Sequence, residues 1–274
     1  MSMPNRLVLV RHGQSEANII QKAEKNGGSP HEQAGVVTKR PDWQQRLSLK
    51  GIEQAKIAGD WVRRELGGVA SFDLRYVSSF LRARETAGHL SGDEAGEWII
   101  DDRIVERDWG VYGAITDLER KERFPWTREM HDISPWYTRL DGGQSRSDIS
   151  MPFRDFQGTL HREAAGKDVL VVAHGDFIAT ARYNLERMTP EQFEEVEADE
   201  DQTIRNCTVL EYSRINPKEE DDVRDKLHWR RITNPIDHDL SPFGGEWVEL
   251  PPRPKFTGAD LLAQVELAPR LLAD

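Results

Sequence analysis

The chain has 274 residues, of which 37% are hydrophobic and 31% are charged. This length and composition suit one large α/β domain with a sizeable core, and they exclude a chain that is disordered throughout. Asp and Glu number 48 against 37 Lys and Arg, which gives a formal net charge of -11. Such an acidic balance argues against nonspecific attraction to nucleic acid or to an anionic membrane surface.

The single cysteine, Cys207, has no partner for an internal disulfide. The sequence displays neither a cleavable signal sequence nor an apolar run long enough to span a membrane. These features predict a cytoplasmic protein with no membrane or nucleic-acid partner. They leave open whether the chain forms a homo-oligomer.

The first element in chain order is a short strand at residues 6–10, RLVLV, of the apolar kind that is buried on both faces of a parallel sheet. It stops at an Arg-His-Gly sequence. Ser48 is then placed to cap a helix whose apolar residues recur on one face as far as Leu66. A strand at residues 74–78 leads into a helix at 81–90, which repeats the order of strand and helix.

The clearest strand is at residues 168–173, DVLVVA, and it too ends at a His-Gly pair. A helix follows at residues 177–186. Strands alternating with helices indicate a layered α/β fold. Further strands are predicted at residues 98–101, 208–212 and 227–232.

The last part of the chain has a different composition. Residues 235–254 contain five prolines, and a short amphipathic stretch follows at residues 261–272. We expect residues 1–233 to form the domain and residues 234–274 to be a proline-rich C-terminal appendage packed on it.

Both His-Gly pairs, His12-Gly13 and His174-Gly175, fall at the end of a predicted strand. In an open α/β sheet, ligands bind beyond the carboxyl ends of the strands, where backbone N–H groups converge. A glycine after each histidine removes a side chain that would keep a ligand away from the backbone. We therefore expect the two histidines to meet at one pocket.

Five sequence blocks occur in order along the chain: 11–18 (RHGQSEAN), 47–55 (LSLKGIEQA), 78–87 (SSFLRARETA), 106–110 (ERDWG) and 173–175 (AHG). Together they resemble the histidine phosphatase superfamily, in its phosphoglycerate mutase-like branch. The resemblance covers about residues 6–212. It implies a three-layer α/β/α sandwich around a mostly parallel sheet.

By this resemblance, His12 is the nucleophile that accepts the phosphoryl group, a role that suits a neutral imidazole. Arg11 and Arg82 correspond to the arginines that hold the phosphoryl oxygens, together with His174. Glu106 corresponds to the acid that protonates the leaving group and then takes a proton from water. These five residues are the predicted catalytic set.

Asn18 matches the phosphate-contacting asparagine of the family. The predicted phosphate-binding residues are Arg11, Asn18, Arg82, His174 and Gly175. Each role has a structural alternative: a strand-end histidine bonded to a carbonyl group, arginines in surface ion pairs, and Glu106 paired with Arg103 or Arg107.

The other histidines have no zinc-binding spacing, and the chain lacks a Walker-type loop and a convincing GxGxxG sequence. We expect no metal and no cofactor.

The predicted reaction is hydrolysis of the phosphomonoester of a small phosphorylated metabolite through a phosphohistidine intermediate. Two departures from the mutases favour hydrolysis. Asp117 stands where their substrate-binding lysine is expected. Asp176 replaces their usual asparagine after the second His-Gly pair, and its carboxylate would repel a second anionic group. The alternatives are a cofactor-dependent phosphoglycerate mutase-type transfer and a noncatalytic relative that binds a phosphorylated ligand. The substrate depends on segments 21–46 and 114–165, for which spacing gives no rule.

Overall fold

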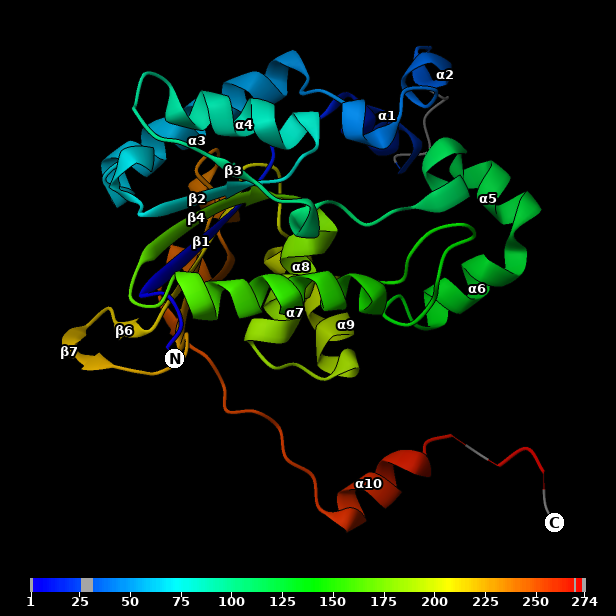
Figure 1. The fold of residues 1–274 in the computed structure, drawn as a ribbon. Coiled ribbons are helices and arrows are strands. Elements are labelled where there is room, and N and C mark those ends of the chain that lie inside the picture. The colour runs from blue at the N-terminus through cyan, green and yellow to red at the C-terminus, as the bar shows by residue number, and fades with distance from the viewer. Residues whose placement is uncertain (1, 26–31, 269, 273–274) are drawn as a thin grey trace.

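The computed structural model describes residues 2–25, 32–268 and 270–272, so residues 26–31 of the variable segment 21–46 lie outside the described residues. A seven-stranded sheet forms its centre (Figure 1). The strands of this sheet are β1 (Arg6–Arg11), β2 (Leu74–Val77), β3 (Ile99–Ile100), β4 (Asp168–Ala173), β5 (Val209–Ser213), β8 (Trp229–Thr233) and β9 (Val248–Glu249). A separate hairpin consists of β6 (Ile215–Asn216) and β7 (Glu219–Val223).

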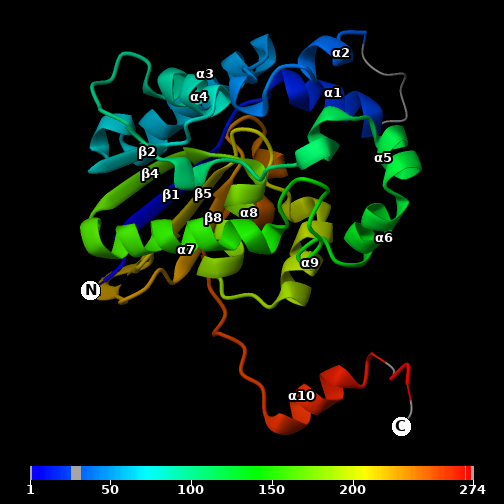
Figure 2. The same ribbon diagram turned by 45° about the vertical axis from the view of Figure 1, so that its right-hand side comes forward.

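The strand order in the sheet is β3-β2-β4-β1-β5-β8-β9. The neighbours from β3 to β1 pair in parallel, and the remaining pairs are antiparallel. Helices cover both faces: α3 (Leu49–Leu66) and α4 (Leu81–Ser91) lie on one, and α7 (Arg146–Glu163) and α8 (Gly175–Leu185) on the other (Figures 1 and 2). This confirms the three-layer α/β/α sandwich. The remaining helices are α1 (Glu16–Lys25), α2 (Ala34–Val37), α5 (Asp117–Arg123), α6 (Pro125–Ile133), α9 (Pro190–Ala198) and α10 (Gly258–Val265).

Strand β1 explains why the sheet needs a helical layer on each side. Leu7 and Leu9 belong to the core beneath α7 and α8, whereas Val8 and Val10 belong to the core beneath α3 and α4. Successive residues of a strand point to opposite faces, and helices cover both faces here, so all four side chains are 0% exposed. The continuous apolar pattern of this strand is therefore explained by burial on both faces.

Several element bounds differ from the sequence predictions. The strand predicted at 98–101 consists only of Ile99 and Ile100, and both are exposed because β3 is the edge strand. Helix α7 was not predicted, although its signals are present. Ser145 and Asp148 form a capping box, and apolar residues at 153, 156 and 160 follow at helical spacing.

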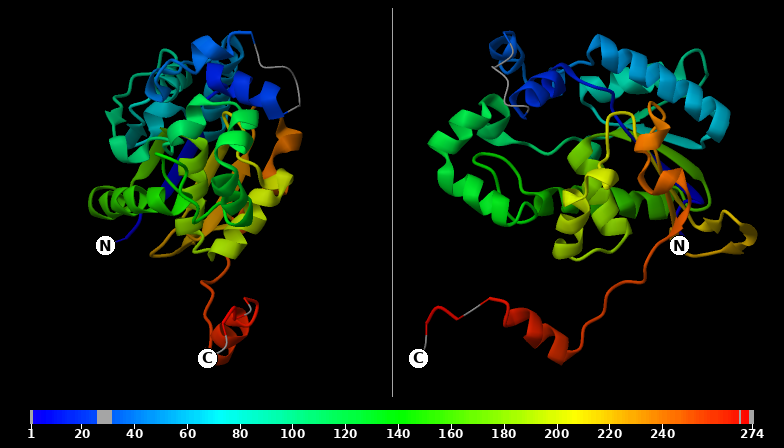
Figure 3. Two further views of the ribbon diagram at one scale, coloured as in Figure 1. Left: turned by 90° about the vertical axis from the view of Figure 1, so that its right-hand side faces the viewer. Right: turned by 180° about the vertical axis from the view of Figure 1, so that it is seen from behind.

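The C-terminal segment is only partly packed on the domain. Strand β9 pairs with β8, and Leu250 is buried. The described residues from 251 onward are nearly all exposed, α10 has no buried residue, and the views show this part standing away from the sheet (Figures 1 and 3). The expectation that the whole segment 234–274 packs on the domain is therefore wrong for the described residues beyond Leu250, because their apolar side chains are exposed to solvent. The domain boundary at residue 233 stays a prediction.

Among the described residues, no helix combines the length and the apolar character that crossing a membrane requires.

The loop after β1 is held against the start of α3 by close backbone contact. The Ser48 hydroxyl accepts a hydrogen bond from the Gly51 N–H at 3.0 Å, which confirms the predicted helix cap. A Cβ atom on Gly13 would lie 2.5 Å from the Gly51 carbonyl oxygen, and a Cβ atom on Gly51 would collide with the Gln14 carbonyl oxygen. Both glycines are therefore needed for the approach of α3 to the loop that carries His12.

We expect Gly51→Ala to lower the free energy of unfolding by about 1–3 kcal/mol, because the new methyl group must push α3 away from the loop. Urea denaturation measures the change. Gly88→Ala in α4 is the matched control: its Cβ atom meets nothing within 4 Å, so the better helix propensity of alanine should leave stability equal or raise it by up to about 1 kcal/mol. Equal stability of the two variants would contradict the close contact.

Candidate active site

The parallel pairing of β1 with β4 places the two strand-end histidines side by side. Arg11 is opposite Ala173 in the register, and the His12 N–H donates to the Ala173 carbonyl oxygen at 3.0 Å. The imidazole rings of His12 and His174 have their centroids 5.1 Å apart, and both residues are buried. The expected meeting of the two histidines at one place is therefore found in the structure.

The hydrogen bonds of His12 define its tautomer. Its Nδ1 lies 2.7 Å from the Gly13 carbonyl oxygen, which can only accept, and the Arg82 Nε donates to its Nε2 at 3.2 Å. The proton is therefore on Nδ1 and the lone pair on Nε2. Burial lowers the pKa of His12 well below its ordinary value, and the charges of Arg82 and Arg11 lower it further. A neutral imidazole with its lone pair on Nε2 is suited to nucleophilic attack once the Arg82 Nε gives up this hydrogen bond.

His174 is held differently. Its Nε2 forms a 2.7 Å hydrogen bond with the Ser78 hydroxyl, and its Nδ1 is buried without a hydrogen-bond partner among the described residues. Burial, followed by the charge of Arg82, lowers the pKa of His174 well below its ordinary value. Sequence reasoning did not assign a role to Ser78, although it is the first residue of the block 78–87.

The Arg11 side chain is half-buried, and its Nη1 donates to the Ile204 carbonyl oxygen at 2.6 Å. Gly175 lies against it, since a Cβ atom there would be 3.3 Å from the Arg11 Cζ. Gly175 thus allows the first turn of α8 to approach this arginine. Neither arginine is exposed on the surface: Arg11 is half-buried, and the Arg82 side chain is 5% exposed.

Arg82 already holds a carboxylate. Its Nη1 and Nη2 each donate to a carboxylate oxygen of Asp42 at 3.1 Å, and Nη1 also donates to the Asp42 carbonyl oxygen at 2.7 Å. The Asp42 side chain is 53% exposed, whereas that of Arg82 is 5% exposed. A phosphate group that binds both nitrogens must displace this carboxylate, a contact that sequence reasoning missed because Asp42 lies in the variable segment 21–46.

Glu106 completes the group around the histidines. Its Oε1 accepts the backbone N–H of Arg107 at 3.0 Å and that of Asp176 at 3.1 Å. Burial and the charge of Asp176 raise its pKa to about 7, against the opposing charge of Arg82. Such a carboxyl group holds a proton near neutral pH and can release it, as a general acid must. The alternative pairing with Arg103 is not found, since Arg103 binds Asp101 and Asp155.

Asn18 is connected to the site indirectly. Its Oδ1 accepts from the Ser15 N–H and from the Asn206 side-chain amide, each at 3.2 Å. The same amide of Asn206 donates to the His12 carbonyl oxygen at 3.0 Å. Asn206 therefore ties Asn18 to the His12 loop, and no sequence signal marked it, because it lies far from the first block along the chain.

The ligand atoms of His12, Glu106 and His174 all lie within 4.8 Å of one another, a spacing that also occurs in metal sites. Two guanidinium groups, of Arg11 and Arg82, act on both histidines. Fixed positive charges repel a cation and attract an anion. The charge of the site thus fits a phosphate group better than a metal ion.

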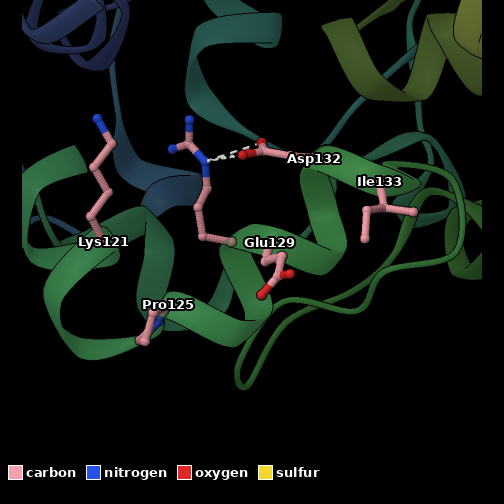
Figure 4. Close-up of a pocket in the computed structure, with 6 residues that line it drawn as sticks. Lys121, Pro125, Glu129, Asp132 and Ile133 are labelled. Carbon is pink, nitrogen blue, oxygen red and sulfur yellow. Dashed lines mark hydrogen bonds and ion pairs between the residues drawn. The ribbon is translucent and has the colours of Figure 1, made fainter.

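A separate cavity of about 460 Å³ lies between α5 and α6 (Figure 4). Its lining includes Lys121, Arg128, Glu129 and Asp132, so its charges are balanced, and Arg128 is paired with Asp132. None of the predicted site residues lines it.

The sequence blocks agree with comparisons to known proteins. A sequence model of the histidine phosphatase superfamily (branch 1) matches residues 7–218. The 2,3-bisphosphoglycerate-dependent phosphoglycerate mutase of Sinorhizobium fredii is 34% identical over 200 residues, which cover 69% of this chain and 83% of that protein. The protein of the same name from Parvibaculum lavamentivorans is 30% identical over 201 residues, with 69% and 84% covered.

Solved structures of similar fold include the mycobacterial glucosyl-3-phosphoglycerate phosphatase, with a TM-score of 0.60 and 20% identity over 81% of this chain and 96% of that one. The alpha-ribazole phosphatase from Shigella flexneri has a TM-score of 0.60 and 18% identity over the same shares, 81% and 96%. At these identities the likeness shows the fold.

We expect Asp42→Asn to strengthen inhibition by inorganic phosphate by roughly tenfold, because the anion no longer competes with a carboxylate for Arg82. Inhibition constants of phosphate and vanadate measure the effect. Asp60→Asn is the control, since it removes an equal charge from an Arg63 pair on the surface of α3 and should leave both constants unchanged. Weaker inhibition of Asp42→Asn would mean that the carboxylate instead orients Arg82 for phosphate.

Proposed function

We propose a hydrolytic function for this chain, which belongs to the histidine phosphatase superfamily: it cleaves the phosphomonoester of a small phosphorylated metabolite through a phosphohistidine intermediate. One observation supports this most strongly. A ring nitrogen of the neutral His12 and a carboxylate oxygen of Glu106, whose pKa is about 7, lie within 4.8 Å of each other, near the charges of Arg11 and Arg82. A nucleophile, an acid and an anion-binding environment are therefore adjacent.

In the first step, the His12 Nε2 lone pair attacks phosphorus, and an N–P bond forms while the P–O bond to the leaving group breaks. Arg11, Arg82 and the His174 ring stabilise the negative charge on the transferred group. Glu106 gives its proton to the departing oxygen, so that an alcohol leaves rather than an alkoxide.

In the second step, water attacks the phosphorus atom of phosphohistidine. The Glu106 carboxylate, now without its proton, takes one from this water as the O–P bond forms. The N–P bond breaks, and its electron pair returns to His12 Nε2. Inorganic phosphate leaves, and both residues regain their starting protonation.

A mutase-type transfer is the second candidate, because the curated relatives at 30% and 34% identity are phosphoglycerate mutases. The sequence argument that Asp176 repels a second anionic group needs correction. The structure pairs this carboxylate with Arg107 at 2.9 Å and with Arg146 at 3.1 Å, so its charge is largely balanced. The case for hydrolysis then depends on Asp117, which begins α5 where a substrate-binding lysine was expected. A 3-phosphoglycerate mutase assay separates the two reactions.

The variable segment 21–46 reaches the predicted site at Asp42, which binds Arg82. We propose a small phosphorylated substrate with an alkyl leaving group and a cytoplasmic location. A screen of phosphorylated sugars and organic acids identifies the substrate. Phosphate binding without turnover of any of them would favour the noncatalytic alternative.

We expect His12→Ala to abolish hydrolysis of an aryl phosphate in the presence of EDTA while the protein stays folded, because alanine removes the Nε2 lone pair that lies against Arg82. Release of inorganic phosphate measures the rate, and circular dichroism checks the fold. His89→Ala on α4 is the control and should retain full activity. Equal rates of His12→Ala and the wild type would remove His12 as the nucleophile.

We expect Glu106→Gln to slow hydrolysis of an alkyl phosphate by about 10²–10⁴-fold and that of an aryl phosphate far less, because an aryl leaving group needs little protonation. The acid must be protonated, so wild-type turnover of the alkyl substrate should fall as the pH rises through about 7. Steady-state pH profiles with both substrates measure this. Equal losses for the two substrates would contradict the role of Glu106 as the acid.

A further inference from the structure

Three charged side chains form a buried cluster next to Glu106, here called the Asp176 clamp: Arg107, Asp176 and Arg146. The Asp176 Oδ2 lies 2.9 Å from the Arg107 Nε, and its Oδ1 accepts from the Arg146 Nε at 3.2 Å and from the Arg146 Nη2 at 3.1 Å. The exposed fraction of the side chain is 0% for Arg107, 10% for Asp176 and 15% for Arg146. An ion cluster at this depth is costly to desolvate, so the loss of one member leaves a buried charge without compensation.

The clamp is attached to Glu106 through backbone groups. The same carboxylate oxygen of Glu106 accepts the N–H groups of Arg107 and Asp176, two members of the clamp. Arg146 lies at the start of α7, Asp176 in the first turn of α8, and Arg146 also reaches Glu197 of α9 at 2.8 Å. The ion pairs thus fix the α8 turn whose N–H holds Glu106 in place.

We propose that Asp176 is a positioning residue for the acid: its carboxylate, clamped by Arg107 and Arg146, fixes the N–H that holds Glu106 and balances the surrounding positive charge so that Glu106 keeps its proton. This rests on the proposed function, in which Glu106 protonates the leaving group. It assigns a role to the aspartate that follows the second His-Gly pair.

The charges around Glu106 explain why this balance matters. The groups that face it are Arg11 of β1, Arg82 of α4, Arg107 beside it, Arg146 of α7, Asp176 of α8, and the neutral rings of His12 and His174. Four of these are guanidinium groups, which favour the ionised carboxylate. Asp176 is the negative charge among them and favours the protonated acid.

Two substitutions break the same clamp but change its charge in opposite directions. Asp176→Asn removes the negative charge, so Glu106 should lose its proton at lower pH. Arg146→Met removes a positive charge, so Glu106 should keep its proton to higher pH. We expect the alkaline limb of the alkyl phosphate pH profile to move down by roughly half to one pH unit in Asp176→Asn and up by a similar amount in Arg146→Met.

A purely structural role predicts a different result, since loss of the clamp would then loosen Glu106 equally in both variants. The proposal would be overturned if the alkaline limbs of the two variants' pH profiles moved in the same direction. A fall in kcat without displacement of either alkaline limb would overturn it too. The aryl phosphate serves as the second readout, because its turnover should fall less than that of the alkyl substrate in both variants. Asp176→Glu, which keeps the charge, should restore the wild-type limb.

The proposal is tested separately from the proposed function by titrating the Glu106 carboxyl group with ¹³C NMR, assigned by the loss of its signal in Glu106→Gln. This measurement needs no turnover. Opposite pKa changes in Asp176→Asn and Arg146→Met would support the clamp even if the protein hydrolysed no phosphomonoester. An unchanged Glu106 pKa in both variants would overturn it. If Asp176→Asn does not fold, Arg146→Met alone still shows whether the Glu106 pKa rises, as the proposal requires.

Discussion

The candidate site depends on the parallel register of β1 and β4. Because Arg11 is paired with Ala173, the residues that follow the two strands emerge at the same edge of the sheet, and their histidine rings come within 5.1 Å between centroids. A shift of the register by one residue would send one ring to the opposite face. The helices beneath and above these strands bury the register on both sides and thereby fix it.

Burial of so many charges at one edge imposes a second constraint. The positive charges of Arg11 and Arg82 are not balanced by a carboxylate of their own strand or helix. Their partners come from other segments: the Ile204 carbonyl group binds Arg11, and Asp42 binds Arg82. A buried charge without partners is costly, so an anion that replaces Asp42 enters a site already prepared for it. The same balance between charges sets the proton affinity of Glu106.

The shared core of nucleophile, arginines and acid does not distinguish a hydrolase from a mutase. The sequence argument for hydrolysis depends on Asp117 in the variable segment 114–165, which lies outside this shared core. In this chain α5 begins with Asp117 after a Thr116 cap, and the described part of α5 and α6 carries balanced charges around its cavity.

The sequence by itself determined the elements with strong local signals and their order. The apolar runs of β1 and β4 predicted that His12 and His174 meet, because strand ends of a parallel sheet converge. The resemblance carried by the five blocks implied the three-layer fold and placed Arg82 and Glu106 with the two histidines. Only the tertiary structure decided which side chains contact these site residues. Asp42 binds Arg82, Ser78 binds His174, and Asn206 joins Asn18 to His12. Arg107 and Arg146 both pair with Asp176. These contacts join segments far apart in the chain. No local spacing encodes them, because they arise from the packing of loops and helix ends around one buried group of charges.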